Sequence, residues 1–80
     1  MSGKLPILSG EELVKILIKQ GFKKVGRKGS HVRLKKKCDG KVLITVVPLH
    51  KELARGTLLA ILRQTEIEKE EFVKLIRGKK

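Results

Sequence analysis

The segment GRKGSHVRLKKK, residues 26–37, combines the residue types in this chain that could carry out chemistry on a phosphate. It places His31 directly after Gly29 and Ser30, in a run otherwise made of cations and two apolar residues. Histidine, with an unperturbed pKa of about 6.5, can transfer protons near neutral pH, and Lys and Arg side chains bind phosphate oxygens. The spacing alone does not separate a reactive histidine from an ordinary surface residue on a basic strand.

The composition of the whole chain favours a polyanionic partner. Twenty Lys+Arg and eight Asp+Glu give 80 residues a formal net charge of +12. A positive field of this size points first to nucleic acid, with an acidic protein or an anionic membrane surface as alternatives. With only two Phe and no Tyr or Trp, the chain lacks aromatic platforms for base stacking, so RNA would be held by charge and hydrogen bonds.

Other classes of protein find little support in the sequence. The apolar runs are too short to span a bilayer, and the first residues lack the layout of a signal peptide. Cys38 is the single cysteine, so no internal disulfide forms, and no Cys/His cluster predicts a zinc site. We expect a cytoplasmic protein with no metal, no cofactor and no membrane association.

Hydrophobic patterning predicts one α+β domain spanning residues 1–80, with a folded core of about residues 9–77. Ser9 and Glu12 form a capping box, and Asp39-Gly40 is a hairpin signal. We expect helices over Gly10–Gln20, from Thr57 as N-cap to about Gln64, and over Glu68–Arg77, with strands at 22–27, 30–37 and 42–47.

The strand at 30–37 has a strict alternation of side chains. Val32 and Leu34 fall on one face, and His31, Arg33, Lys35 and Lys37 fall on the other. Helices should cover the apolar face of a three-stranded antiparallel sheet and leave the opposite face to solvent. His31 is therefore expected on an open, basic face.

The sequence resembles the HicA (YcfA-like) toxins of HicAB toxin–antitoxin pairs, from about Ser9 to Ile76. Several short motifs carry this resemblance, in the family's order and spacing. They are Gly21-Phe22, Gly29-Ser30-His31, Val47-Pro48-Leu49-His50, Gly56-Thr57-Leu58, Ile61-Leu62-Arg63-Gln64 and Glu71-Phe72.

The resemblance implies a double-stranded-RNA-binding-domain-like fold and a metal-independent endoribonuclease that cleaves mRNA. It assigns the family's histidine to His31 and implies a HicB-type antitoxin as partner. The chain departs from the family at two positions. Gly26 stands where an arginine is frequent, five residues before the histidine, and Glu66 replaces a glycine that often breaks the chain after the second long helix. The second departure predicts a smoother junction between the last two helices.

In such an enzyme the ribose 2′-OH attacks the adjacent phosphate, and His31 acts as the general base. The residues expected to hold RNA, by charge or by close backbone approach, are Arg27, Lys28, Gly29, Ser30, Arg33, Lys35 and Lys37. His50 is a possible acid, although a structural hydrogen bond near the second helix is the favoured interpretation. Thr57 is a helix cap whose neighbouring N–H groups could also bind phosphate.

Two functions from different classes remain open. The first is an RNA-cleaving toxin that uses His31. The second is a non-catalytic RNA-binding module whose basic sheet face contacts phosphates, as double-stranded-RNA-binding domains do. Gly29-Ser30-His31 favours the first, because simple binding does not require it. A membrane-surface protein would need a long basic amphipathic helix, which the sequence lacks.

Overall fold

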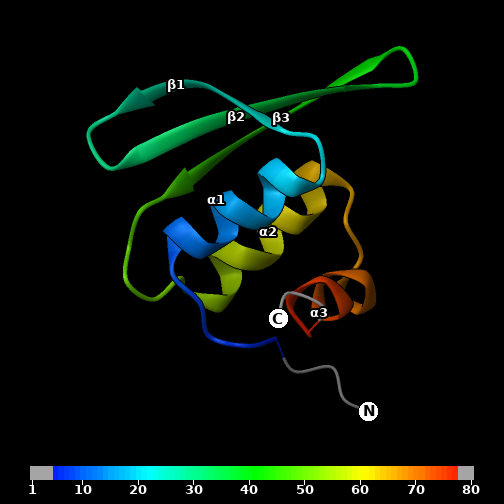
Figure 1. Cartoon of the computed structure of the whole chain (residues 1–80). Coiled ribbons are helices and arrows are strands. Elements are labelled where there is room, and N and C mark those ends of the chain that lie inside the picture. Colours follow the sequence, from blue (N-terminus) through cyan, green and yellow to red (C-terminus); the bar gives the residue numbers. More distant parts are fainter. Residues whose placement is uncertain (1–4, 78–80) are drawn as a thin grey trace.

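The computed structural model of the chain describes residues 5–77, which form a helix, three strands and two further helices (Figure 1). The α+β class and the element order agree with the sequence prediction. The elements are α1 (Gly10–Lys19), β1 (Lys23–Lys28), β2 (His31–Cys38), β3 (Lys41–Pro48), α2 (Arg55–Thr65) and α3 (Lys69–Arg77).

The three strands form one antiparallel sheet in the order β1-β2-β3, joined by two tight turns. In the second turn Asp39 and Gly40 both have positive φ, of 50° and 79°, as a type I′ turn requires. In the first turn Gly29 alone has a positive φ, of 58°, which is the pattern of a type II′ turn. Local turn chemistry thus fixes both hairpins.

The β1 strand is shorter and less regular than its neighbours. Lys24 pairs with Leu34 and Gly26 with Arg33, so Val25 is an extra residue in a β-bulge. Pairing of β1 ends at Lys23 opposite Lys35. Beyond this point β2 continues to Cys38 with β3 as its only partner, and the β2–β3 hairpin projects past the start of β1 (Figure 1).

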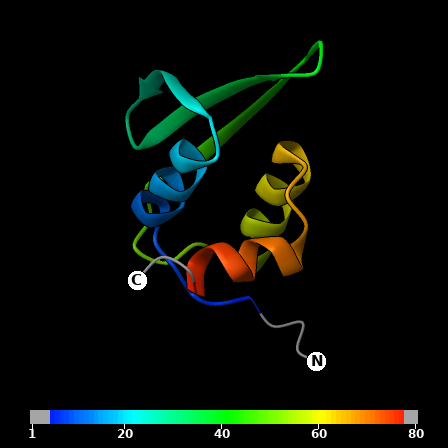
Figure 2. The same ribbon diagram turned by 45° about the vertical axis from the view of Figure 1, so that its right-hand side comes forward.

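The helices lie on one side of the sheet, as predicted (Figures 1 and 2). Helices α1 and α2 contact β3, while α3 lies across the helix layer on the side away from the sheet. Leu34 of β2 and Phe72 of α3 are both fully buried. The buried Thr45 hydroxyl donates to the Gln64 side-chain oxygen at 2.6 Å, so the polar group between sheet and α2 is satisfied.

Within residues 5–77 no helix has the length and apolar character needed to cross a membrane.

The beginning of α2 differs from the prediction. Thr57 is not the N-cap, because α2 starts at Arg55, three residues earlier than expected, and Ala54 occupies the cap position with an extended backbone. The N–H of Leu58 donates to the Ala54 carbonyl at 3.0 Å, which places Thr57 in the first turn. The preceding residue, Leu53, is buried and its N–H donates to Leu8, so tertiary contacts rather than a capping side chain set this boundary.

The junction after α2 also differs from the prediction. Glu66 adopts a left-handed backbone conformation, with φ 59° and ψ 34°, and terminates the helix. The expected smoother junction was wrong, because the chain reverses here although the residue is not glycine. This break lets the chain turn into α3 and brings Phe72 into the core.

Candidate functional site

His31 is the first residue of β2 and lies immediately after the Gly29-Ser30 turn. Its neighbours across the sheet are Lys28 of β1 and Pro48 of β3. The side chain is exposed and forms no hydrogen bond with any described residue. The alternation of β2 is as predicted, because Val32 and Leu34 are buried against the helices. His31 therefore stands on the open face of the sheet.

The backbone of the turn before His31 is held from both sides. The Leu49 N–H donates to the Ser30 carbonyl at 2.6 Å, which ties the turn to the segment after β3. On the other side, Arg27 Nε donates to the Gly29 carbonyl at 3.0 Å. Two backbone carbonyls are thereby fixed, so the position of His31 is set by the fold rather than by contacts of its own side chain.

The cations of the open face follow from the strand register. Arg33, Lys35 and Lys37 share the face of His31 on β2, and Lys28 pairs with His31 from β1. None of them pairs with a carboxylate of residues 5–77. Four positive charges along one face, without local compensation, create a strong field for a phosphate-bearing ligand.

Gly26 of β1 is one of the two positions at which the sequence departs from the pattern of the family that it resembles. Gly26 pairs with Arg33, and open space surrounds the point where its Cβ would be. Arg33 thus provides a cation beside the position that is often arginine in the family. Arg27 does not replace that arginine on the open face, because it pairs with the inward-facing Val32 and its guanidinium bonds the Gly29 carbonyl.

His50 lies at the same end of the sheet as His31, two residues after Pro48. Its carbonyl accepts a hydrogen bond from Gly10 N–H at 2.9 Å, at the start of α1 rather than near α2. The structural hydrogen bond of His50 is therefore made by its backbone, and the exposed imidazole forms none with the described residues. Thr57 lies half-buried in α2, on the helix side of the sheet, apart from the open face.

The open face also carries apolar residues that sequence reasoning did not single out. Val42, Ile44 and Val46 of β3 are 41–51% exposed and pair with Lys37, Lys35 and Arg33 in turn. We call these three β3 residues the apolar stripe. The signal was present in the alternation of β3, in which Thr45 and Val47 alternate with the stripe and are buried.

No group of three or more His, Cys, Asp or Glu side chains suited to a metal ion occurs in residues 5–77. The chemistry available at this face is therefore that of one imidazole, nearby cations and the N–H groups of a fixed turn.

These features define a small basic α+β domain with an exposed histidine at one end of a cationic sheet face. The family model described as "HicA toxin of bacterial toxin-antitoxin" matches residues 10–67. The chain belongs to this family. Comparison with curated proteins and with solved structures gave no match, and the likeness to double-stranded-RNA-binding domains stays a prediction.

Proposed function

We propose that this HicA-family toxin is an endoribonuclease that cleaves mRNA in the cytoplasm without a metal, with His31 as the general base. The observation that supports this most directly is the position of His31. It is exposed on a face whose cations have no carboxylate partner within residues 5–77. A surface of that kind suits binding of a phosphodiester beside a group that can accept a proton.

In the proposed reaction His31 removes the proton of a ribose 2′-OH. The freed oxygen forms a bond to the adjacent phosphorus, and the bond from phosphorus to the 5′-oxygen of the next nucleotide breaks. Lys28 pairs with His31 and Arg33 is the next residue on its face, so both cations can balance the charge that develops on the phosphate. The N–H groups and hydroxyl of the Gly29-Ser30 turn are further donors to phosphate oxygens.

The leaving 5′-oxygen needs a proton, and His50 is the candidate donor in this chain. Its side chain is exposed at the same end of the sheet and its structural bond uses only the backbone. His50 is the second histidine of the chain, and histidine is the side chain most often used for proton transfer in catalysis. Without such a donor, solvent would supply the proton and cleavage would be slower.

The first prediction tests the role of His31 with the change His31→Ala. RNA cleavage should fall by about 10²- to 10⁴-fold, the usual contribution of positioned proton transfer. The fold should survive because His31 is exposed, and most RNA binding should survive because cations make the phosphate contacts. Purified variants would be compared in a cleavage assay, in an RNA-binding assay and by circular dichroism.

His50→Ala tests the candidate proton donor, and a smaller loss of activity is expected for it because solvent can supply that proton. EDTA should leave the rate of the parent protein unchanged. A His31→Ala variant that cuts RNA as fast as the parent would rule out His31 as the base. The non-catalytic RNA-binding module would then be the better description.

A HicB-type antitoxin is the proposed partner protein, and we place its contact on the open face around residues 29–37. The supporting observation is the apolar stripe, because RNA phosphates make no use of exposed Val and Ile side chains. A protein surface with an apolar centre and acidic groups around it would match both the stripe and the cations beside it. Such a partner would block access of RNA to His31.

A further inference from the structure

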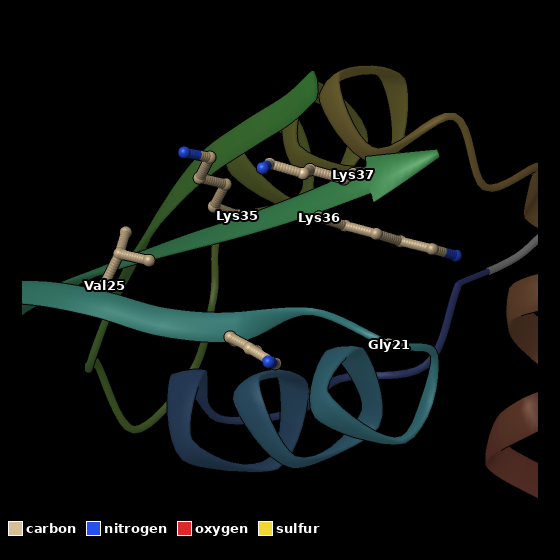
Figure 3. A pocket seen from close by; sticks show the side chains of 6 residues that line it. Gly21, Val25, Lys35, Lys36 and Lys37 are labelled. Atoms are coloured by element: carbon tan, nitrogen blue, oxygen red, sulfur yellow. The ribbon is translucent and has the colours of Figure 1, made fainter. Parts of the chain in front are cut away.

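A second feature of the sheet lies at the opposite end of β2 from His31. It is a cleft of about 450 Å³. Figure 3 shows the cleft and the side chains around it. Six residues line it: Gly21, Lys23, Val25, Lys35, Lys36 and Lys37.

The cleft results from the way β1 joins the sheet. Pairing with β2 ends at Lys23 opposite Lys35, and the chain turns away toward α1 through Gly21, whose φ is +103°. Next to this point, the bulge at Val25 breaks the regular register. The projecting part of β2 is thus left beside an open notch.

Lys36 is the most constrained side chain of the cleft. It extends to the opposite side of the strand from Lys35 and Lys37 (Figure 3). Its Nζ lies 5.7 Å from the centroid of the buried Phe22 ring, a cation–π contact. A Cβ at Gly21 would lie only 3.2 Å from Lys36 Cε, so the missing side chain leaves room for this arrangement.

The charge of the cleft is unbalanced. Four of its lining residues are lysines and none is acidic, and none of these lysines pairs with a carboxylate of the described residues. Uncompensated positive charges around an open cleft create a field that attracts an anionic group such as a phosphate.

We propose that this cleft binds a backbone phosphate of the RNA substrate, several nucleotides away from the bond that is cut. This inference rests on the proposed function for the identity of the ligand. Lys35 and Lys37 follow His31 by four and six residues, a separation of roughly 13–20 Å at about 3.3 Å per strand residue. An RNA strand must be several nucleotides long to reach both sites, so the cleft makes binding depend on substrate length.

The second prediction tests the cleft with the double change Lys23→Gln and Lys36→Gln, which leaves every cation placed near His31 in position. The control is Lys69→Gln with Lys74→Gln, which removes the same charge from exposed positions of α3, away from the sheet. Affinity would be measured at several salt concentrations for RNAs of about 3 and about 15 nucleotides. For the long RNA, the cleft variant should bind severalfold more weakly, and its log–log salt slope should fall by about one for each phosphate that the variant no longer binds.

The short RNA should bind the parent and the cleft variant equally. In cleavage of the long RNA, KM should rise while kcat stays the same, because the cleft is remote from the reacting bond. Equal losses in the α3 control would show a general effect of net charge and overturn the proposal. Equal losses for the short RNA, or no loss at all, would overturn it as well.

The binding measurements do not require cleavage. If the length effect is observed and the parent protein fails to cut RNA, the cleft is supported as an RNA contact and the proposed reaction is contradicted. If His31→Ala abolishes cleavage and the length effect is absent, the proposed reaction is supported and the cleft is contradicted.

Discussion

Gly10, at the start of α1, links the first helix to the end of the sheet that carries His31. Its N–H donates to the His50 carbonyl at 2.9 Å, and the residue is buried against the chain after β3. A Cβ on Gly10 would overlap the carbonyl oxygen of Pro48, which is the cross-strand partner of His31. This single residue therefore sets how closely α1 approaches the site.

The third prediction concerns Gly10→Ala. In an ordinary helix position alanine is more favourable than glycine by about 1 kcal/mol. Here the overlap is with backbone that cannot rotate away, so we expect a loss of about 1–3 kcal/mol in the free energy of unfolding, as for an overpacked core. Urea denaturation followed by circular dichroism would measure it.

Gly56→Ala provides the matched control for this prediction. Gly56 lies in the first turn of α2, and apart from its chain neighbours and the backbone of its own helix no heavy atom lies within 4 Å of the point where its Cβ would be. This change should leave stability equal or raise it by up to about 1 kcal/mol. Similar stability of the two alanine variants would mean that α1 does not approach Pro48 closely enough to exclude a side chain.

At the scale of elements, the end of α2 is joined to the start of β3 by an ion pair. Lys41 Nζ lies 2.9 Å from Glu66 Oε2, and both side chains are more than half exposed. The hydrogen bond to Glu66, together with its negative charge, raises the pKa of Lys41 above its ordinary value. A raised lysine pKa stabilises the fold at all pH values below the ordinary pKa, and the contribution is lost as the pH rises through the folded pKa. The pair therefore gives no pH dependence near neutrality.

The fourth prediction separates this ion pair from the backbone conformation of Glu66. Glu66→Ala removes the pair but keeps a side chain at φ 59°, whereas Glu66→Gly removes the pair and relieves the left-handed conformation. Since that conformation costs a non-glycine residue about 1–2 kcal/mol, the glycine variant should be more stable than the alanine variant by about 1 kcal/mol. The thermal unfolding temperatures of the two variants would be compared, and the variant Lys41→Met would measure the contribution of the ion pair alone. An alanine variant as stable as the glycine variant would contradict the strained cap.

The elements that sequence reasoning predicted well are those fixed by local chemistry. The Asp39-Gly40 turn and the alternation through Val32 and Leu34 depend on neighbouring residues, and both are found as expected. The start of α2 depends on the bond from Leu53 to Leu8. The left-handed Glu66 is closed by local bonds, in which the N–H groups of Glu66 and Ile67 donate to carbonyls at the end of α2. A contact such as that between Leu53 and Leu8 joins residues far apart in the chain, so a short segment of sequence does not predict it.

The same distinction applies to the site. The open basic face around His31 follows from strand period and could be predicted. The lysine cleft depends on the bulge at Val25 and on where β1 leaves β2. The sequence of one strand does not determine which residues of the next strand it pairs with. The cleft depends on that register, so only the structure shows it.

At the scale of the whole molecule, the charges are segregated. Seven of the eight acidic residues lie in or beside the helices, and Asp39, at the tip of the β2–β3 hairpin, is the exception. The cations of β1 and β2 dominate the sheet side. The molecule thus presents one strongly positive side, and under the proposed function RNA and the antitoxin would compete for the same residues there.

The fifth prediction uses the apolar stripe to separate these two ligands. Ile44→Thr keeps a β-branched residue on β3 and removes only apolar surface, since Ile44 is 51% exposed. Affinity for the antitoxin encoded with the toxin should fall by at least about fivefold, or ~1 kcal/mol, as for a residue inside an interface core. RNA cleavage should stay unchanged. Calorimetry and a cleavage assay would measure the two effects.

Ile18→Thr is the control, because Ile18 is 43% exposed on α1, outside the sheet face. It should bind the antitoxin as the parent does. Unchanged antitoxin affinity of Ile44→Thr, or a complex in which the open face stays uncovered, would contradict the proposed contact.

The order of the strands in the sheet repeats their order in the chain, and each connection is a turn of two residues. Sheets built from consecutive hairpins have contacts close in sequence, and such domains fold faster than those that must close long loops. Individual hairpins form in about 1–10 μs. The sheet is thus expected to form early after the chain leaves the ribosome. Under the proposed function, neutralisation would then not rely on slow maturation of the toxin, and the antitoxin would have to be present when the toxin is made.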